Sequence, residues 1–288
     1  MPSILPRSYL FVPANRPERF SKACATHAGA VIIDLEDAVA ADDKASARAA
    51  LAAWLNPCTP VLVRINSADS RWFRDDLALC GLAGVAGIVL PKAERVTDVA
   101  SVARAAAANS IILPLIESAL GMSNAAALAR APRVQRLVFG SIDFQLDLGI
   151  DGDDQELLYF RSQLVLLSRL AGIAPPVDGV STAIDDLEQL RSDSERARRL
   201  GFAAKLCIHP KQVDIVNQAF MPNDVSVRWA TRVLAAASGA GGGAIAVDGM
   251  MVDRPVLRKA MDILEAAGGP AAGGSTIHPP QENTHAPS

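Results

Sequence analysis

The sequence has few cysteines and none of the spacings that cysteine sites use. Its four cysteines are Cys24, Cys58, Cys80 and Cys207, and they form neither a CxxC pair nor a zinc-type spacing. The pattern argues against a disulfide scaffold and a cysteine-rich zinc site. It is typical of free, buried thiols in a reducing compartment, so we expect a cytoplasmic protein.

Long apolar runs and excess positive charge are also missing. No run approaches the roughly 20 apolar residues of a membrane-spanning helix. The start, MPSILPRSYLFVPANRPERF, is broken by prolines and charges, so we do not expect a signal peptide. The formal net charge is −3, which leaves no strong positive field to attract nucleic acid or an anionic membrane.

Several nucleotide-binding and hydrolase motifs are absent. The sequence contains no GxGxxG after an apolar run, no GxxxxGK[ST], no HExxH and no GxSxG. Aromatic residues make up only 5% of the chain, whereas alanine is abundant. That balance favours helices that cover a sheet.

What is present is a regular alternation of short apolar runs and alanine-rich amphipathic stretches. Eight such runs, each followed by a helical stretch, predict an α/β protein with a closed (β/α)8 TIM barrel. An open doubly wound sheet is the competing architecture. The predicted strands are residues 9–13, 30–34, 61–66, 87–91, 111–116, 136–140, 176–180 and 204–209. The predicted helices begin near residues 16, 42, 72, 96, 122, 155, 185 and 211.

The pattern changes towards the C-terminus. The glycine run Gly239–Gly243 reads as a hinge and is followed by a strand-like piece, a turn at Asp248-Gly249 and a helix from Arg254. We therefore predict a barrel over residues 1–240, a C-terminal segment over 241–267, and a disordered Gly/Pro/Ser/Thr-rich tail over 268–288.

Two carboxylates follow buried strands at the rim where barrel chemistry occurs. Glu117 follows ILPLI, and Asp143 follows RLVFGSI. A carboxylate there must be paired, hydrogen-bonded or bound to a metal. One interpretation is an Mg²⁺ site that uses both side chains. The other is a salt bridge to Lys92 or Arg64, or a helix N-cap.

Three other rim residues have two interpretations each. Arg64, inside VLVRIN, either forms a buried ion pair with a nearby acid or clamps a substrate carboxylate. Lys92, which ends GIVLPK, either holds a carboxylate or forms a Schiff base in a metal-free aldolase. His209 is either a base or ligand, or a hydrogen-bonded rim histidine.

Taken together, these strand ends resemble the citrate lyase beta-subunit family of pyruvate-binding (β/α)8 barrels. The resemblance covers about residues 7 to 265. The matching stretches are RSYLFVPANRPERF, AVIIDLEDAVAADDKASAR, VLVRIN, GIVLPKAE, ILPLIESALGM, VFGSIDFQLDLG and CIHPKQV.

The resemblance implies roles for particular residues. Glu117 and Asp143 match the two Mg²⁺ ligands, and Arg64 matches the arginine that binds the keto-acid carboxylate. Asp37 lies in the LEDAV motif near the metal and its waters. The segment GMMVDRPVLRKA resembles a C-terminal lid, in which an aspartate matching Asp253 reaches a neighbouring subunit's active site as an acid–base group. The family is typically trimeric or hexameric, so the resemblance implies a homotrimer or homohexamer.

The implied activity is Mg²⁺-dependent cleavage of a citryl-, citramalyl- or malyl-type thioester, carried on CoA or on an acyl carrier. Two alternatives are a Schiff-base aldolase that uses Lys92 and a non-catalytic binding subunit. Many family members differ from this chain at Ala14, Ile142, Met250 and near Ser181. These differences bear on the acyl substrate and leave the metal pair untouched.

Overall fold

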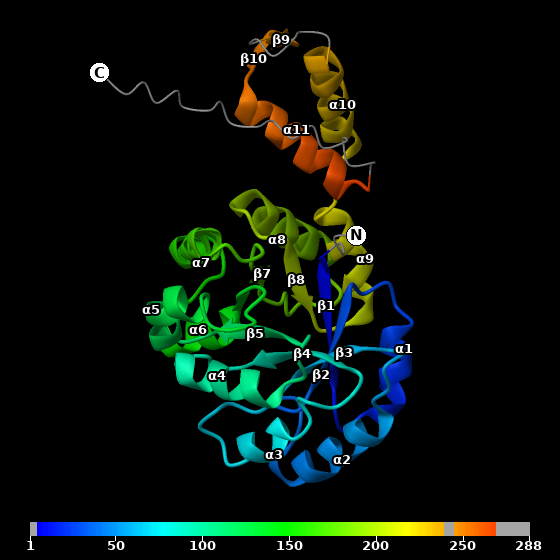
Figure 1. Cartoon of the computed structure of the whole chain (residues 1–288), viewed down its shortest axis with the longest axis vertical. Helices are drawn as coiled ribbons and strands as arrows, with labels where there is room; N and C mark the ends of the chain where they lie inside the picture. The colour runs from blue at the N-terminus through cyan, green and yellow to red at the C-terminus, as the bar shows by residue number, and fades with distance from the viewer. Residues whose placement is uncertain (1–4, 239–244, 269–288) are drawn as a thin grey trace, which may run out of the picture. The chain divides into compact units, whose positions relative to one another are not determined.

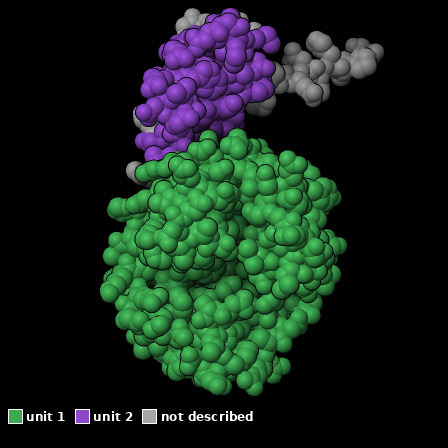
Figure 2. All heavy atoms as spheres, turned by 180° about the vertical axis from the view of Figure 1, so that it is seen from behind, with its two compact units in different colours: residues 1–220 green, residues 221–288 purple. Residues whose placement is uncertain are grey.

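The chain, described by a computed structural model over residues 5–238 and 245–268, forms two compact units. They comprise residues 1–220 and 221–288 (Figure 2). This division at residue 220 differs from the sequence-based boundary at residue 240. Helix α10 (Asp224–Ser238) packs against α11 (Arg254–Ala266) through an apolar cluster that includes Val233 and Ala260, so it belongs to the second unit. The predicted tail lies outside the described residues, except for Gly268.

The first unit is a closed barrel of eight parallel strands in sequence order (Figure 1). This confirms the predicted fold class, and each predicted strand is present, mostly within two residues of its expected ends. The strands are β1 (Ser8–Pro13), β2 (Ala30–Asp34), β3 (Val61–Arg64), β4 (Val85–Leu90), β5 (Ile111–Ile116), β6 (Val138–Phe139), β7 (Val177–Asp178) and β8 (Ala204–Cys207).

Helices follow each strand and surround the barrel (Figure 1). They are α1 (Phe20–Cys24), α2 (Lys44–Trp54), α3 (Phe73–Leu77), α4 (Val96–Ala105), α5 (Ala119–Leu128), α6 (Ser141–Leu148), α7 (Leu158–Ala171), α8 (Leu187–Leu200) and α9 (Pro210–Ala219). Short 3₁₀ turns, η1 (Pro17–Arg19), η2 (Ala41–Asp43) and η3 (Gln155–Leu157), lead into α1, α2 and α7. The sequence-based prediction did not include α6, because it extended the sixth strand to residue 140 and began the next helix near residue 155.

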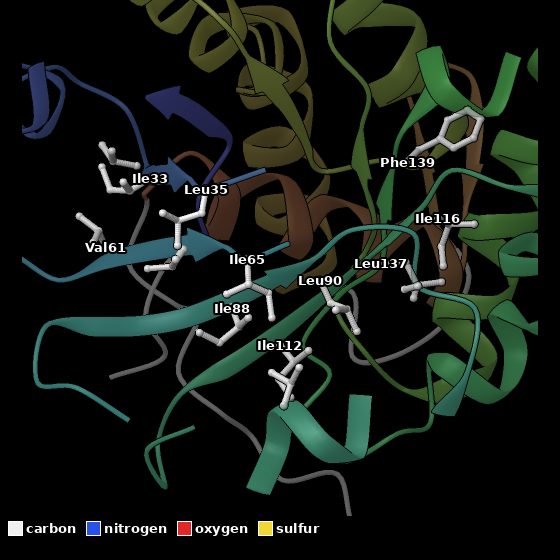
Figure 3. Close-up of a cluster of buried hydrophobic side chains, with 14 of the residues drawn as sticks. Ile33, Leu35, Val61, Ile65, Ile88, Leu90, Ile112, Ile116, Leu137 and Phe139 are labelled. Atoms are coloured by element: carbon white, nitrogen blue, oxygen red, sulfur yellow. The ribbon is translucent and has the colours of Figure 1, made fainter. Parts of the chain in front are cut away.

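Successive residues along each strand pack on opposite faces, which gives the barrel two apolar layers. On β2, Ile32 joins an inner cluster with Leu113 and Val138. Ile33 joins the outer cluster, which also contains residues of the surrounding helices such as Leu51 (Figure 3). Because both faces of the strands are buried and largely apolar, we expect the polar site at the strand ends.

The second unit contains an antiparallel hairpin and two helices. Strands β9 (Ile245–Val247) and β10 (Met250–Val252) are joined at Asp248 and Gly249, whose φ values are 52° and 77°. Positive φ at both residues is typical of a type I′ turn, and the turn predicted at Asp248-Gly249 is confirmed. Across the described residues of both units, no helix has the length and apolar character needed to cross a membrane.

Candidate active site

A cavity of about 430 Å³ opens at the carboxyl ends of the barrel strands. Its lining contains four carboxylates and one guanidinium, and the rest of the lining is largely apolar. The charged members are Asp34, Asp37, Arg64, Glu117 and Asp143. Four of the six predicted site residues, Asp37, Arg64, Glu117 and Asp143, thus line one cavity.

Glu117 is the most deeply placed of the predicted metal ligands. It follows β5 and is only 4% exposed. Its Oε1 accepts a hydrogen bond from the backbone N–H of Lys92 at 2.6 Å. A Cβ at Gly140, on the neighbouring strand end, would lie 2.6 Å from its Oε2, so the lack of a side chain there makes room for the carboxylate. Burial, followed by the nearby charges of Glu36 and Asp143, raises the pKa of Glu117 to about 8.

Asp143 approaches the same cavity from a helix. The sequence placed it at the end of the sixth strand. It actually lies in the first turn of α6, which begins directly after β6. An acidic residue in the first turn is favoured by the positive partial charge of the helix N-terminus. The α6 N-cap is Gly140, without a side-chain bond, so Asp143 is not the cap that the alternative interpretation allowed.

The two carboxylates fit a divalent cation. Asp143 is one of the charges that raise the pKa of Glu117, so the pair repels itself when both groups are ionised, and a cation between them would relieve that repulsion. Ser141, whose buried Oγ lacks a hydrogen-bond partner, also lines the cavity. Among residues 5–238 and 245–268, no group of three or more His, Cys, Asp or Glu side chains gathers as a metal site. A hard ion such as Mg²⁺, which keeps several waters, needs only one or two protein carboxylates.

Arg64 is held by carboxylates beside the cavity. Its Nε and Nη2 donate to the two carboxylate oxygens of Asp34, each at 2.7 Å. Its Nη1 lies 3.0 Å from Oε2 of Glu36, and its guanidinium stacks 4.8 Å from the ring centre of Phe11. Burial lowers the pKa of Arg64, but Asp34 and the other acids outweigh it and raise that pKa. The ion-pair interpretation is therefore correct, and Arg64 also lines the cavity, as the clamp interpretation requires.

Lys92 supports the site from outside the cavity lining. Its Nζ donates to Oε1 of Glu36 at 2.9 Å, and its side chain is 45% exposed. Burial lowers the pKa of Lys92. The hydrogen bond to Glu36 and the nearby acidic charges raise it by more than burial lowers it, so the net shift is upward. A nucleophilic lysine needs a lowered pKa. The environment of Lys92 thus disfavours a Schiff base and favours a role in holding Glu36.

The remaining acid–base candidates have different surroundings. Asp37 is exposed and lines the cavity, and it is not the carboxylate that pairs with Arg64 through two hydrogen bonds, which is Asp34. Asp253 lies in the second unit, where its Oδ1 accepts the backbone N–H of Val256 at 3.2 Å and caps α11. His209 caps α9, with its Nδ1 accepting the N–H of Lys211 and Gln212 completing a capping box. The rim-histidine interpretation is correct for His209.

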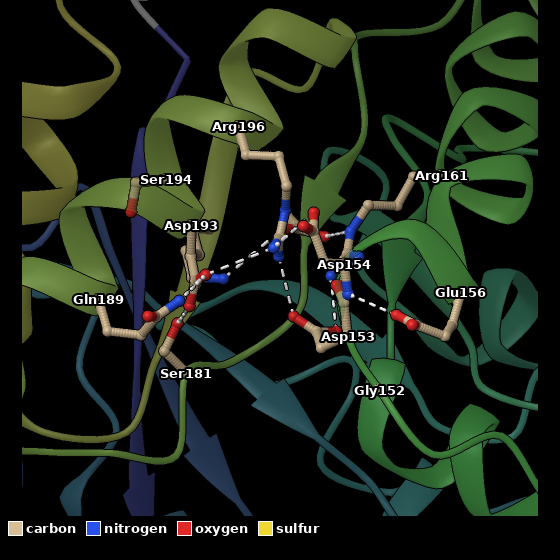
Figure 4. A network of polar contacts seen from close by, with 12 residues as sticks. Gly152, Asp153, Asp154, Glu156, Arg161, Ser181, Gln189, Asp193, Ser194 and Arg196 are labelled. Carbon is tan, nitrogen blue, oxygen red and sulfur yellow. Dashed lines mark hydrogen bonds and ion pairs between the residues drawn. The ribbon is translucent and has the colours of Figure 1, made fainter.

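A network of charged side chains holds the loop after α6 (Figure 4). Arg161 donates to the backbone carbonyl and the carboxylate of Asp153, and also to Asp178 on β7. Arg196 on α8 reaches Asp153 and Asp154. This loop borders a second cavity that shares Ile142 and Val180 with the first. The network was not predicted from the sequence, because its members come from separate loops and elements and share no motif.

A family model and several known proteins are similar to this chain. The family model described as HpcH/HpaI aldolase/citrate lyase matches residues 7–210. A citrate lyase subunit beta-like protein of Deinococcus radiodurans is 38% identical over 281 residues, covering 91% of this chain and 98% of that protein. A (3S)-malyl-CoA thioesterase of Cereibacter sphaeroides is 36% identical over 255 residues, covering 86% and 89%.

A solved structure is similar over nearly the whole chain. It is the protein CitE of Mycobacterium tuberculosis in complex with magnesium, acetoacetate and coenzyme A. It is 36% identical to this chain, with a TM-score of 0.81, and the match covers 91% of this chain and 98% of that one.

Proposed function

Because the chain belongs to the HpcH/HpaI aldolase/citrate lyase family, we propose that it is a Mg²⁺-dependent carbon–carbon lyase. Its substrate is a 3-hydroxy-3-carboxyacyl or malyl-type thioester on CoA or an acyl carrier. Cleavage gives an acetyl- or acyl-thioester and an α-keto acid such as oxaloacetate, pyruvate or glyoxylate. The main support is that Glu117, Asp143 and Arg64 line one cavity. A solved relative binds magnesium and coenzyme A together.

Three residues would bind and orient the reacting end of the substrate. Glu117 and Asp143 hold the Mg²⁺, which when bound supplies Lewis acidity to substrate oxygens. Arg64 orients the substrate carboxylate with the N–H groups that Asp34 and Glu36 leave free. Both carboxylate oxygens of Asp34 bind one edge of the guanidinium, through Nε and Nη2, so its direction is fixed before substrate binds.

The acid–base steps need a group that can take and return a proton. A base removes the proton of the substrate hydroxyl, the carbon–carbon bond breaks, and its electron pair passes to the thioester as an enolate. An acid then protonates the enolate carbon. Asp37 is our barrel candidate for this role, and its support is that it is exposed and lines the cavity. Asp253 is the second option, supplied by the C-terminal segment.

A thioester panel tests the proposal. Citryl-, citramalyl- and malyl-type thioesters are incubated with Mg²⁺ and then with EDTA, and keto-acid release is measured. We expect release from at least one of them with Mg²⁺ and a loss of release with EDTA. Undiminished cleavage in EDTA would contradict the metal's role, and no cleavage of any thioester would favour the non-catalytic binding subunit.

Thioester hydrolysis is a second candidate function, because curated relatives 36% identical to this chain are (3S)-malyl-CoA thioesterases. Both reactions release a product from malyl-CoA, but the products differ. A lyase gives glyoxylate and keeps the thioester bond intact, whereas a thioesterase gives malate and a free thiol. Following the free thiol beside the keto acid separates the two activities.

A Schiff-base aldolase is the alternative that the Lys92 environment disfavours. Borohydride reduction in the presence of pyruvate is the direct test. We expect no mass increase on Lys92, and activity that depends on Mg²⁺.

We also propose that the chain acts as a homotrimer or homohexamer in which Asp253 serves a neighbouring active site. Mixing Glu117→Gln protein with Asp253→Asn protein tests this, since a mixed oligomer would contain some intact sites. Recovery of activity on mixing is expected, and its absence despite subunit exchange contradicts sharing.

A further inference from the structure

The cavity offers cationic partners for only one substrate carboxylate. Arg64 is the sole cationic side chain among the described residues that line it. Asp34, Asp37, Glu117 and Asp143 line the same cavity. A divalent cation there would leave the lining negative even after it is bound, so a second substrate carboxylate would meet repulsion.

The guanidinium itself is largely occupied. Arginine carries five N–H donors. Two of those of Arg64 donate to Asp34, and a further one faces Glu36. The remaining donors suit one bidentate carboxylate and no more.

The rest of the cavity lining is largely apolar. Leu115 and Leu206 belong to the inner apolar cluster of the barrel and form part of the cavity lining. Phe139, Val180 and Ile208 extend this surface. A carboxylate pressed against these side chains would lose its hydration and gain no partner. A hydrogen atom or a methyl group would fit without that penalty.

We propose that this enzyme selects thioesters whose keto-acid product has a single carboxylate and a small apolar substituent or none. Malyl-type thioesters, which release glyoxylate, and citramalyl-type thioesters, which release pyruvate, meet this requirement. Citryl-type thioesters release oxaloacetate, whose second carboxylate has no cationic partner on the described cavity wall. The selectivity rests on the proposed lyase function.

The first test compares kcat/KM for citramalyl-CoA and citryl-CoA with saturating Mg²⁺. An unpaired buried charge is rejected far more strongly than an extra methylene, so we expect a preference on the order of 100-fold for citramalyl-CoA. Equal values, or a preference for citryl-CoA, would overturn the selectivity while leaving the lyase function intact.

A gain-of-function variant tests the physical cause. Ile142 lines the cavity and is 47% exposed, so a longer side chain is accommodated without disturbing the core. Ile142→Arg adds the missing cation, and Ile142→Gln is the matched neutral control. The arginine variant should raise the citryl-to-citramalyl ratio about tenfold, and the glutamine variant should not. An equal rise in both variants would attribute the selectivity to shape and contradict the charge argument.

A binding measurement separates the failure of this inference from the failure of the lyase function. Calorimetric titration of the Mg²⁺-loaded protein with pyruvate and with oxaloacetate needs no turnover. Tighter binding of pyruvate supports the selectivity even if no thioester is cleaved. Tighter binding of oxaloacetate overturns it even if the lyase assays succeed.

Discussion

The backbone N–H of Lys92 donates to Oε1 of Glu117 at 2.6 Å, and Lys92 is one of three residues other than glycine that have positive φ in the described chain. Its φ is 47°, a left-handed conformation that a lysine adopts at a cost. In that conformation the backbone N–H of Lys92 points at the buried carboxylate of Glu117. The end of β4 therefore fixes the position of the acid that follows β5.

The strain at Lys92 predicts an order of stability between two variants. Lys92→Gly and Lys92→Ala both remove the ion pair with Glu36, but only glycine relaxes the backbone. We expect the glycine variant to have a free energy of unfolding about 1 kcal/mol higher than that of the alanine variant. Urea unfolding of both proteins measures the difference, and a more stable alanine variant would contradict the strain.

The raised pKa of Glu117 predicts how the stability of metal-free protein depends on pH. The pKa is about 8 in the fold, against 4.5 for an unperturbed glutamate. Between these values the folded state holds a proton that the unfolded state has lost, so the free energy of unfolding falls as pH rises and levels off above about pH 8. The fall is on the order of a few kcal/mol.

The control for this pH dependence is Glu117→Gln, which cannot titrate. In EDTA its stability should fall less between pH 5.5 and 8.5 than that of the unmodified protein, when both are measured by urea unfolding. Identical pH profiles for the two proteins would show that Glu117 is not responsible. Mg²⁺ should raise the free energy of unfolding of the unmodified protein mainly near pH 8.5, because the metal binds the ionised carboxylate.

Arg64 is predicted to matter for both stability and binding. Arg64→Lys keeps the charge but loses the two-point contact with Asp34, leaving a buried carboxylate partly unsatisfied. We expect a loss of about 2 kcal/mol in the free energy of unfolding and a fall of roughly 100-fold in kcat/KM. Arg74→Lys, an exposed substitution on α3, is the matched control. Wild-type kinetics for Arg64→Lys would argue against the clamp.

The network in Figure 4 predicts a large stability difference within one helix. Arg161 is buried and pairs with Asp178, which is fully buried on β7, whereas Arg169 on the same helix is exposed. Arg161→Met should cost about 3–5 kcal/mol, because it leaves buried Asp178 with fewer partners. Arg169→Met should change stability by less than about 0.5 kcal/mol. Thermal unfolding of the two variants, run side by side, gives the comparison.

The barrel could be predicted from the sequence because its signal is repeated. Short apolar runs such as ILPLI are buried on both faces, and each is followed by an amphipathic stretch, so one pattern recurs eight times. Helix α6 was missed because only Gly140 separates it from the two-residue strand β6, with no longer turn between them. Gly149, which ends α6 in the left-handed conformation, was the available signal.

The sequence predicted which residues form the site better than it predicted what their side chains contact. Strand-end position indicated Glu117 and Arg64, because parallel strands deliver their carboxyl ends to one rim. The sequence left open whether Arg64 pairs with an acid or faces a ligand, since both require a buried guanidinium. In the folded protein, Asp34 takes two of the guanidinium donors. The boundary at residue 220 was not predicted because the sequence of α10 resembles those of the barrel helices. Its packing against α11 is what assigns it to the second unit.

The most direct test of the account is calorimetric titration of four proteins with Mg²⁺: the unmodified chain, Glu117→Gln, Asp143→Asn and Asp147→Asn. Asp143 and Asp147 lie one turn apart on α6, and only Asp143 lines the cavity. Loss of a ligand should weaken binding by at least about 100-fold, more than the loss of a supporting residue. We expect that loss in the Glu117 and Asp143 variants, and unchanged affinity in Asp147→Asn. Unchanged affinity in Glu117→Gln and Asp143→Asn would contradict the metal site.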